Sequence, residues 1–146
     1  MAYADLTHKI IGAAIEVHRQ RGPGLLESAY EECLARELSI RNLAFERQKP
    51  IPLVYKGVKI ECGYRIDLLV EHRIVLELEA IEQIVPIHEA VVLTYIKLSG
   101  ISVGLLINFH VAILKDGIRR YIGKEKNDFN AEARRDHAEA EKNPYA

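Results

Sequence analysis

Two alternating segments joined by a three-residue turn dominate the middle of the sequence. Apolar side chains stand at every second position over residues 64–70, and the alternation returns over residues 74–80. A period of two is typical of a β-strand, and Glu71-His72-Arg73 between the segments is a short polar turn. The sequence therefore predicts an antiparallel hairpin in which Val70 faces Ile74.

The register of this hairpin brings acidic residues together. Residues whose numbers sum to 144 face each other, so Asp67 faces Glu77 and Arg65 faces Glu79. Side chains directly opposite lie about 4.5–5.5 Å apart at Cβ, and like charges there are destabilising. A hard divalent ion such as Mg²⁺, held by carboxylates, a backbone carbonyl and waters, would stabilise such a pair. The alternative is a solvent-facing ribbon, where water screens both carboxylates.

Helical and strand-like periods follow one another along the rest of the chain. Apolar residues spaced by three or four predict helices, whereas short alternating or apolar segments between turn residues predict strands. The expected helices lie at 5–20, 25–38 and 87–98, and the expected further strands, in one sheet with the hairpin, at 51–55, 58–62, 101–109 and 118–122. Asp5 or Thr7 is expected to cap the first helix. Because a helix separates the strands at 74–80 and 101–109, those two strands should be parallel.

Length and composition predict one globular domain of the α/β (α+β) class. A chain of 146 residues can build one hydrophobic core, and its 49% hydrophobic content is ordinary for a globular protein. We expect the domain to span residues 1–123 and the charged segment 124–146 to form a tail. The formal net charge of -1 gives no overall attraction to nucleic acid, so any such contact requires a local basic patch.

The chain carries no sequence signal for secretion or a membrane. Its first residues lack a basic segment followed by an apolar one, and no apolar run approaches the ~20 residues of a membrane helix. Cys33 and Cys62 lie far apart and form no CxxC pair, so we expect free, buried thiols rather than a disulfide or a zinc site. These features predict a soluble cytoplasmic protein.

Several motifs, in order along the chain, resemble one protein family. Gly24-Leu-Leu-Glu27-Ser-Ala-Tyr30 matches the pattern that names the GxxExxY family. The resemblance continues through IIGAAIEVH at 10–18, YRIDLLV at 64–70, HEA at 88–90, LTY at 93–95, GLLINF at 104–109 and LKDGI at 114–118. It covers about residues 5–122. This family is similar to the PD-(D/E)XK nuclease superfamily, which implies a mixed sheet flanked by helices and a role in cleaving DNA or RNA.

The resemblance also implies a metal site. Asp67 would be the first acidic ligand of Mg²⁺ or Mn²⁺ and Glu77 the second. Glu27 would match the extra acidic residue that many of these nucleases add, and the carbonyl of Leu78 would complete the ligand set. Asp67, Glu77 and Glu79 are therefore the candidate catalytic residues.

Substrate-binding candidates come from the hairpin and from the helix at 87–98. Arg65 lies beside the acidic residues, while His88 and Tyr95 are seven residues apart on one face of that helix. A histidine and a tyrosine that merely pack in the core would show the same spacing. Lys97 lies on the opposite side of the helix from His88 at 100° per residue, so it is a poor substitute for a catalytic lysine.

Two positions depart from the family pattern. The lysine of the family's Glu-x-Lys motif is replaced by Glu79, and the glutamine of its helix motif by Val91. The lysine stabilises developing negative charge and helps to activate water, which a glutamate cannot do by charge. Some restriction enzymes of this fold do carry Glu or Gln in that position. Two hypotheses follow: an impaired metal-dependent nuclease, or an inactive relative that binds nucleic acid or protein, including a copy of itself as a homo-oligomer.

Overall fold

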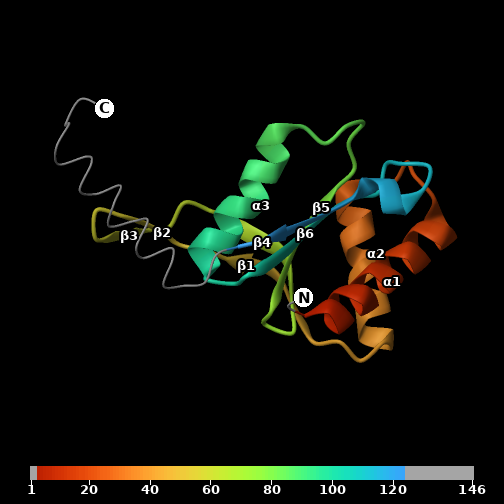
Figure 1. Ribbon diagram of the computed structural model, residues 1–146, viewed down its shortest axis with the longest axis horizontal. Helices are drawn as coiled ribbons and strands as arrows, with labels where there is room; N and C mark the ends of the chain where they lie inside the picture. The colour runs from red at the N-terminus through yellow and green to blue at the C-terminus, as the bar shows by residue number, and fades with distance from the viewer. Residues whose placement is uncertain (1–2, 124–146) are drawn as a thin grey trace.

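A computed structural model describes residues 3–123 of the chain, which fold into a sheet with helices on both faces (Figure 1). The helices are α1 (Ala4–Arg21), α2 (Glu27–Ile40) and α3 (Pro86–Ser99), with a short 3₁₀ helix η1 (Leu114–Gly117). The strands are β1 (Phe45–Pro50), β2 (Leu53–Tyr55), β3 (Val58–Ile60), β4 (Arg65–Val70), β5 (Ile74–Glu79), β6 (Val103–Asn108) and β7 (Ile118–Ile122). This mixed α+β architecture confirms the predicted fold class.

The main sheet has five strands in the order β1-β4-β5-β6-β7. Strands β5 and β6 are parallel and are joined by α3, which confirms the predicted crossover. The other neighbours are antiparallel. In the β4–β5 hairpin Val70 faces Ile74 and Leu68 faces Leu76, which is the register expected from the sequence.

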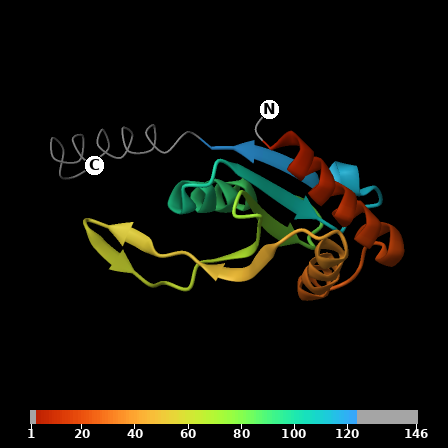
Figure 2. The ribbon, with the colours of Figure 1, turned by 90° about the horizontal axis from the view of Figure 1, so that it is seen from below.

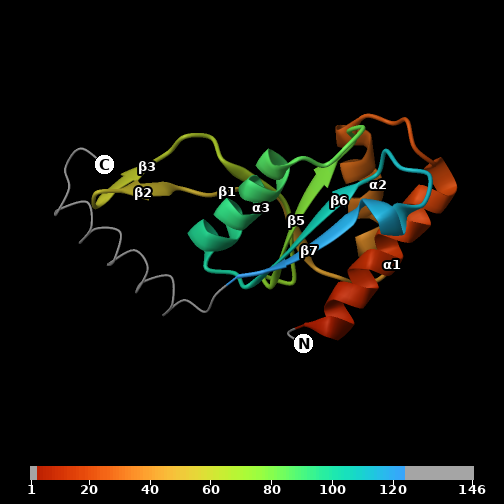
Figure 3. The same ribbon diagram turned by 45° about the horizontal axis from the view of Figure 1, so that its top comes forward.

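Each face of the sheet has its own hydrophobic core. Leu76 and Leu78 of β5 pack in a large cluster with α1 and α2, while Val75 packs toward Tyr95 of α3. The alternation arises because successive side chains of a strand point to opposite faces. Gly104 of β6 lets α3 approach closely, since a Cβ at that position would lie 2.8 Å from Ile96 Cδ1. Figure 3 shows α3 on one side of β5–β7 and α1 on the other.

Strands β2 and β3 form a separate two-stranded hairpin that projects from the body of the domain (Figure 2). The expectation that they belong to the main sheet is therefore wrong. Their turn is as predicted: Lys56 and Gly57 both have positive φ, at 48° and 79°, which matches a tight hairpin turn whose twist suits the two strands.

The structure corrects several further expectations. Strand β1 was not predicted, because its polar residues Arg47, Gln48 and Lys49 hide any alternation. Helix α1 begins at Ala4, before both expected caps, so Asp5 and Thr7 lie inside the helix. The hydroxyl of Thr7 is buried and has no hydrogen-bond partner among the described residues. The two cysteines are free, but Cys62 is exposed.

In residues 3–123 no helix is long and apolar enough to cross a membrane. The predicted tail lies outside the described residues.

Candidate active site

Strands β4 and β5 separate at Asp67 and Glu77. Their ladder runs from the turn as far as Leu68 and Leu76 and then stops. Beyond that pair, side chains replace the backbone bonds: the N–H of Asp67 donates to Glu77 Oε1 at 3.2 Å, and the N–H of Leu78 donates to Asp67 Oδ2 at 2.8 Å. The two predicted acidic ligands are thus in direct contact with each other's strand.

The carbonyl of Leu78 faces this opening. The N–H and C=O of one residue in a strand point to the same side, and the N–H of Leu78 points toward β4. The carbonyl of Glu79 points the other way and accepts a bond from the N–H of Phe109, at 2.9 Å. Leu78 therefore presents its carbonyl oxygen to the gap that also holds Asp67 and Glu77.

Glu27, the first residue of α2, reaches the same site. Tyr30, one turn later, is fully buried, donates a hydrogen bond to the carbonyl of Gly22 at 2.5 Å and stacks on Phe109 with ring centroids 4.4 Å apart. Tyr30 thereby fixes the loop before α2 and contacts that loop rather than the Glu27 carboxylate. The side chain of Glu27 shares a hydrogen bond with that of Glu79, the last residue of β5.

The carboxyl groups of Glu27, Asp67, Glu77 and Glu79 lie in this region, and their surroundings raise the pKa of each of them. Burial raises the pKa of Glu77 to about 9, with the charge of Asp67 adding to the effect. Burial, with the charges of Glu79 and Asp67, raises the pKa of Glu27 to about 7. The pKa values of Asp67 and Glu79 are also raised, in both cases mainly by burial. A cation bound here would relieve both the repulsion and the loss of solvation.

Gln48 and Glu31 belong to the site but were missed by sequence reasoning. Gln48 Nε2 donates to Asp67 Oδ1 at 3.3 Å and also to Glu31 Oε1, and Arg47 Nη2 pairs with Glu31 Oε2 at 2.8 Å. Gln48 has φ of 48°, a left-handed conformation that costs energy in a non-glycine residue. Glu31 stands four residues after Glu27 on the same face of α2, and this spacing was the one available signal.

The three predicted substrate-binding residues relate to the carboxylates in different ways. His88 Nδ1 accepts a hydrogen bond from the N–H of Val85 at 3.0 Å, and its ring lowers the pKa of Glu79 electrostatically. Burial and then the charges of Glu77 and Asp67 raise the pKa of Tyr95, so this ring also borders the site. Arg65 does not pair with Glu79 as expected; its Nη1 donates to the carbonyl of Gln48 at 3.4 Å.

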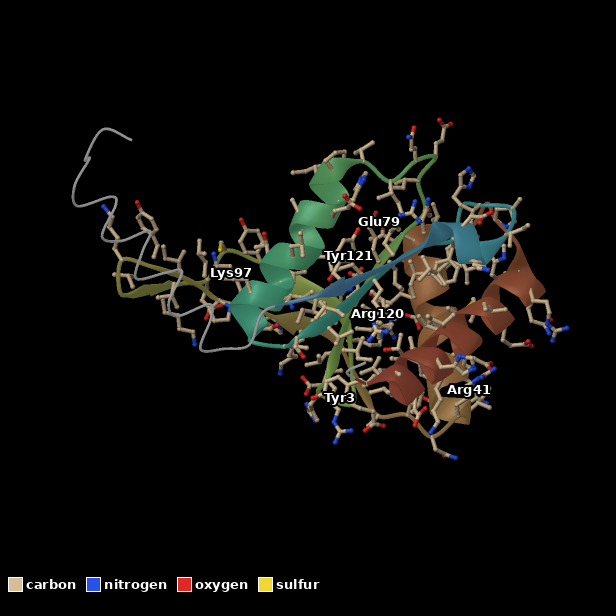
Figure 4. All side chains as sticks on the ribbon, in the orientation of Figure 1. Tyr3, Arg41, Glu79, Lys97, Arg120 and Tyr121 are labelled. Atoms are coloured by element: carbon tan, nitrogen blue, oxygen red, sulfur yellow. The ribbon has the colours of Figure 1, made fainter. Side chains whose placement is uncertain are left out.

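The loop between β5 and α3 is fixed by Asn108, a buried residue at the end of β6. Its side chain accepts a bond from the N–H of Ile81 at 3.1 Å and donates to the carbonyl of Ile81 at 2.8 Å. This loop leads to the N-terminal turn of α3, which carries His88. Figure 4 places Glu79 toward that end of α3 and Lys97 toward the other end, so Lys97 is remote from the carboxylates.

The donor set fits a hard divalent ion. Carboxylate and carbonyl oxygens are the ligands that Mg²⁺ prefers, and Mg²⁺ is usually held by one or two carboxylates, waters and substrate phosphate rather than by a protein cage. In the described range no three His, Cys, Asp or Glu side chains are grouped so that they could hold a metal ion by themselves. Asp67, Glu77 and the Leu78 carbonyl would therefore supply only part of a ligand set, and water or substrate would have to supply the rest.

Comparison with known protein families places most of the chain in one superfamily. The family model described as the PD-(D/E)XK nuclease superfamily matches residues 4–121, most of the chain. Neither the curated proteins nor the solved structures that were compared with the chain include a significant match. The matched range contains every residue of the site described above.

Proposed function

Because the chain belongs to the PD-(D/E)XK nuclease superfamily, we propose that it is a metal-dependent phosphodiesterase of nuclease type with a weakened active site. The observation that carries this proposal is the opening between β4 and β5, where Asp67, Glu77 and the Leu78 carbonyl meet. The GxxExxY pattern supports a narrower assignment to that family, which we also propose.

Asp67 and Glu77 would hold Mg²⁺ or Mn²⁺ together with the carbonyl of Leu78. When bound, such an ion supplies Lewis-acid polarisation of a phosphate ester. Glu27 adds a third carboxylate near the ligands, and the raised pKa of this group, about 7, lets it hold a proton close to neutral pH. Gln48 orients Asp67 by donating to Oδ1, while Oδ2 is held by the N–H of Leu78.

We expect weak catalysis because Glu79 replaces the lysine of the superfamily motif. It occupies the position of the superfamily lysine and hydrogen-bonds Glu27, so it adds a fourth acid to a site that needs positive charge in the transition state. Among charged groups, His88 of α3 is the one that lowers the pKa of Glu79. An imidazole on a separate helix replaces a lysine at position 79 only in part.

A second candidate function is nucleic-acid or protein binding without cleavage. The side chains of Asp67 and Glu77 already accept backbone hydrogen bonds from the opposite strand, so both residues have a structural role that needs no metal. Combined with the replacement of the lysine by Glu79, this arrangement is what an inactive relative that kept its fold would show.

Calorimetry with Mn²⁺ and Mg²⁺ separates the two functions. A metal-dependent enzyme binds the ion with measurable heat, and the heat disappears in an Asp67→Asn, Glu77→Gln variant that retains hydrogen-bonding groups. The companion assay follows cleavage of plasmid and single-stranded DNA and of RNA with each ion. Metal binding with cleavage that this variant lacks supports the enzyme. No heat and no cleavage by the wild type supports the binding protein.

A further inference from the structure

The hairpin arm, defined as residues 52–64 and containing β2 and β3, is the least supported part of the domain. It projects away from the sheet beyond α3 (Figure 2). Within residues 3–123, none of the arm's residues belongs to a buried hydrophobic cluster. A two-stranded hairpin standing alone is marginally stable in water. An arm of this kind is explained by a binding partner that covers it.

One face of the arm is apolar and exposed. Tyr55 pairs with Val58, and Leu53 with Ile60, and these four side chains share a face because alternate residues of a strand point the same way. Tyr55 is 59% exposed and Val58 61% exposed. An exposed apolar patch on a protein surface marks a binding site more often than chance.

The charged residues of the arm indicate which kind of partner would bind it. Lys56 and Lys59 lie on the arm and Arg65 at its base, against the single acid Glu61, whereas the whole chain has a net charge of -1. Lys56 Nζ lies 5.5 Å from the centroid of the Tyr55 ring. Lys59 pairs with Val54 on the opposite face of the arm from Tyr55, and its Nζ lies 4.0 Å from Glu61 Oε1. Lys56 is therefore the arm's lysine beside the exposed ring. A lysine beside an exposed aromatic ring is a combination with which proteins bind single-stranded nucleic acid, because the ring stacks on a base and the lysine neutralises a phosphate.

The arm is continuous with the candidate active site. It grows from β1 and β4, the strands that carry Gln48 and Asp67, and its base is closed by a bond from the N–H of Ile51 to the carbonyl of Tyr64 at 2.8 Å. The Tyr64 ring lies 6.2 Å from the ring of Tyr95, centroid to centroid, and Tyr95 borders the carboxylates. The two tyrosines thus bridge the arm and the site.

We propose that the arm binds a single strand of nucleic acid, with bases stacked on Tyr55 and Tyr64 and a phosphate paired with Lys56. Binding by the arm stands by itself, whereas delivery of the strand to Asp67 and Glu77 rests on the proposed function. A single strand is favoured over a duplex because a duplex hides the faces of its bases inside the stack. A second copy of this chain is the rival occupant of the apolar face.

The test measures binding by the full chain in EDTA, so that no cleavage interferes. Fluorescence anisotropy with a labelled oligodeoxythymidine is compared with a duplex of equal length. We expect Tyr55→Ala to weaken single-strand binding about tenfold, within the range for one lost base stack. Lys56→Gln should reduce the slope of log K against log salt by about 0.7, the contribution of one phosphate contact.

Lys115→Gln is the matched control, because this exposed lysine belongs to η1 at the opposite end of the domain from the arm (Figure 3). It should bind the single strand as the wild type does. Tyr55→Phe should also bind normally, because the ring is kept. Thermal unfolding of each variant should match the wild type, since the arm lies outside the hydrophobic clusters. If Tyr55→Ala unfolds at a lower temperature than the wild type, the salt slope of Lys56→Gln decides instead.

Three outcomes overturn the inference: no single-strand binding by the wild type, arm variants that bind as tightly as the wild type, or a reversible dimer in sedimentation that Tyr55→Ala dissociates. The last result assigns the face to a second copy. The proposed function fails separately. Arm variants that lose single-strand binding in a protein that neither binds Mn²⁺ nor cleaves would uphold the inference alone. Normal binding by arm variants of a cleaving enzyme would uphold the function alone.

Discussion

The side chains of Asp67 and Glu77 each accept a backbone hydrogen bond from the strand that carries the other residue. Glu77 Oε1 accepts from the N–H of Asp67, and Asp67 Oδ2 accepts from the N–H of Leu78. The two acids stand where the β4–β5 ladder ends and replace its hydrogen bonds. The opening that the proposed metal requires is therefore stabilised by the same groups that would bind the metal. This double role leads to predictions about stability as well as about activity.

The first prediction concerns the structural role of Asp67. Asp67→Ala leaves the N–H of Leu78 without its acceptor in a largely buried place, which costs about 1–3 kcal/mol. Asp67→Asn keeps an oxygen that accepts this bond and should lose clearly less stability, although both variants should lose metal binding. Urea unfolding in EDTA measures the difference. Equal stabilities of the two variants would show that the bond to Leu78 contributes little.

The second prediction concerns Glu79. Glu79→Lys restores the charge pattern of the superfamily and places a cation beside Glu27 and Asp67. In the wild type the charges of Glu79 and Asp67 both raise the pKa of Glu27, and the charge of Asp67 raises the pKa of Glu79. Losing one stabilising group at such a site commonly changes rates about 10²–10³-fold, so the variant should gain activity of that order. Glu79→Gln is the control that removes the negative charge without adding a positive one. Cleavage of DNA at equal concentrations of folded protein decides between them.

A contrary result for Glu79 is easily recognised. If the wild type cleaves DNA with Mg²⁺ and Glu79→Lys abolishes the reaction, then Glu79 acts as a base or ligand in its own right. The pKa of Glu27 provides a second readout, because a lysine at position 79 should lower it from about 7 even where no cleavage occurs.

The third prediction concerns Gln48, whose φ of 48° is unusual for its residue type. Gln48→Ala and Gln48→Gly both lose the bonds to Asp67 and Glu31, but only glycine adopts this conformation without strain. The glycine variant should therefore be more stable than the alanine variant by about 1–2 kcal/mol. Both should bind Mn²⁺ more weakly than the wild type. Alanine and glycine variants of equal stability would indicate that position 48 relaxes to a negative φ.

The fourth prediction is a dependence of stability on pH without metal. The pKa of Glu77 is about 9 in the folded protein against an ordinary value of 4.5, so the folded state holds the proton more tightly than the unfolded state. The resulting stabilisation is complete below about pH 4.5 and is lost as the pH rises through 9. We expect the free energy of unfolding in EDTA to fall by at least about 1.4 kcal/mol between pH 5 and pH 9, the equivalent of one pKa unit.

Glu77→Gln tests the origin of this pH dependence. The variant cannot ionise at position 77 and should lose much of the decline, leaving the smaller contribution of Glu27 between about pH 4.5 and 7. Added Mn²⁺ should stabilise the wild type more at high pH than at low pH, because metal binds the ionised carboxylates. An unchanged decline in Glu77→Gln would place its source elsewhere.

The fifth prediction concerns the packing of α3 against Gly104 of β6. A methyl group at Gly104 would lie 2.8 Å from Ile96 Cδ1 and 2.9 Å from Val92 Cγ1, so Gly104→Ala should cost about 1–3 kcal/mol by overpacking. Ile96→Val removes the nearer atom. The double variant should therefore be more stable than the sum of the two single changes predicts, and a double-mutant cycle by urea unfolding measures this coupling. Simple additivity would mean that α3 shifts away as a unit.

Local periodicity predicted most of the elements that build the main sheet. The β4–β5 register follows from the three-residue turn, because a slip of one residue would turn Leu68 and Leu76 away from the core under α1 and α2. The parallel pairing of β5 and β6 follows from the helix between them. The predicted Arg65–Glu79 pair was wrong because the ladder does not continue to those positions: the side chains of Asp67 and Glu77 end it first.

Strand β1 and the hydrogen bonds of Gln48 to Asp67 and Glu31 could not be predicted from the sequence. The strand lies at the edge of the sheet, where lysine and proline are tolerated, so its residues show no regular alternation. Gln48 meets Asp67 only through pairing with a strand nineteen residues away, and its left-handed backbone has no signature in a glutamine. Long-range pairing, rather than local pattern, assembles this half of the site.

The exchange of bonds between Asp67 and Glu77 also sets the order in which such a site would be lost during evolution. A chain that no longer needs to cleave anything still needs to fold, and selection for folding alone would retain an acceptor for the N–H of Leu78. No backbone group in the described residues depends on a cation at position 79. A lysine there would be lost first and the aspartate last. Asp67 and Glu77 beside Glu79 is the combination that the first step of that order would leave.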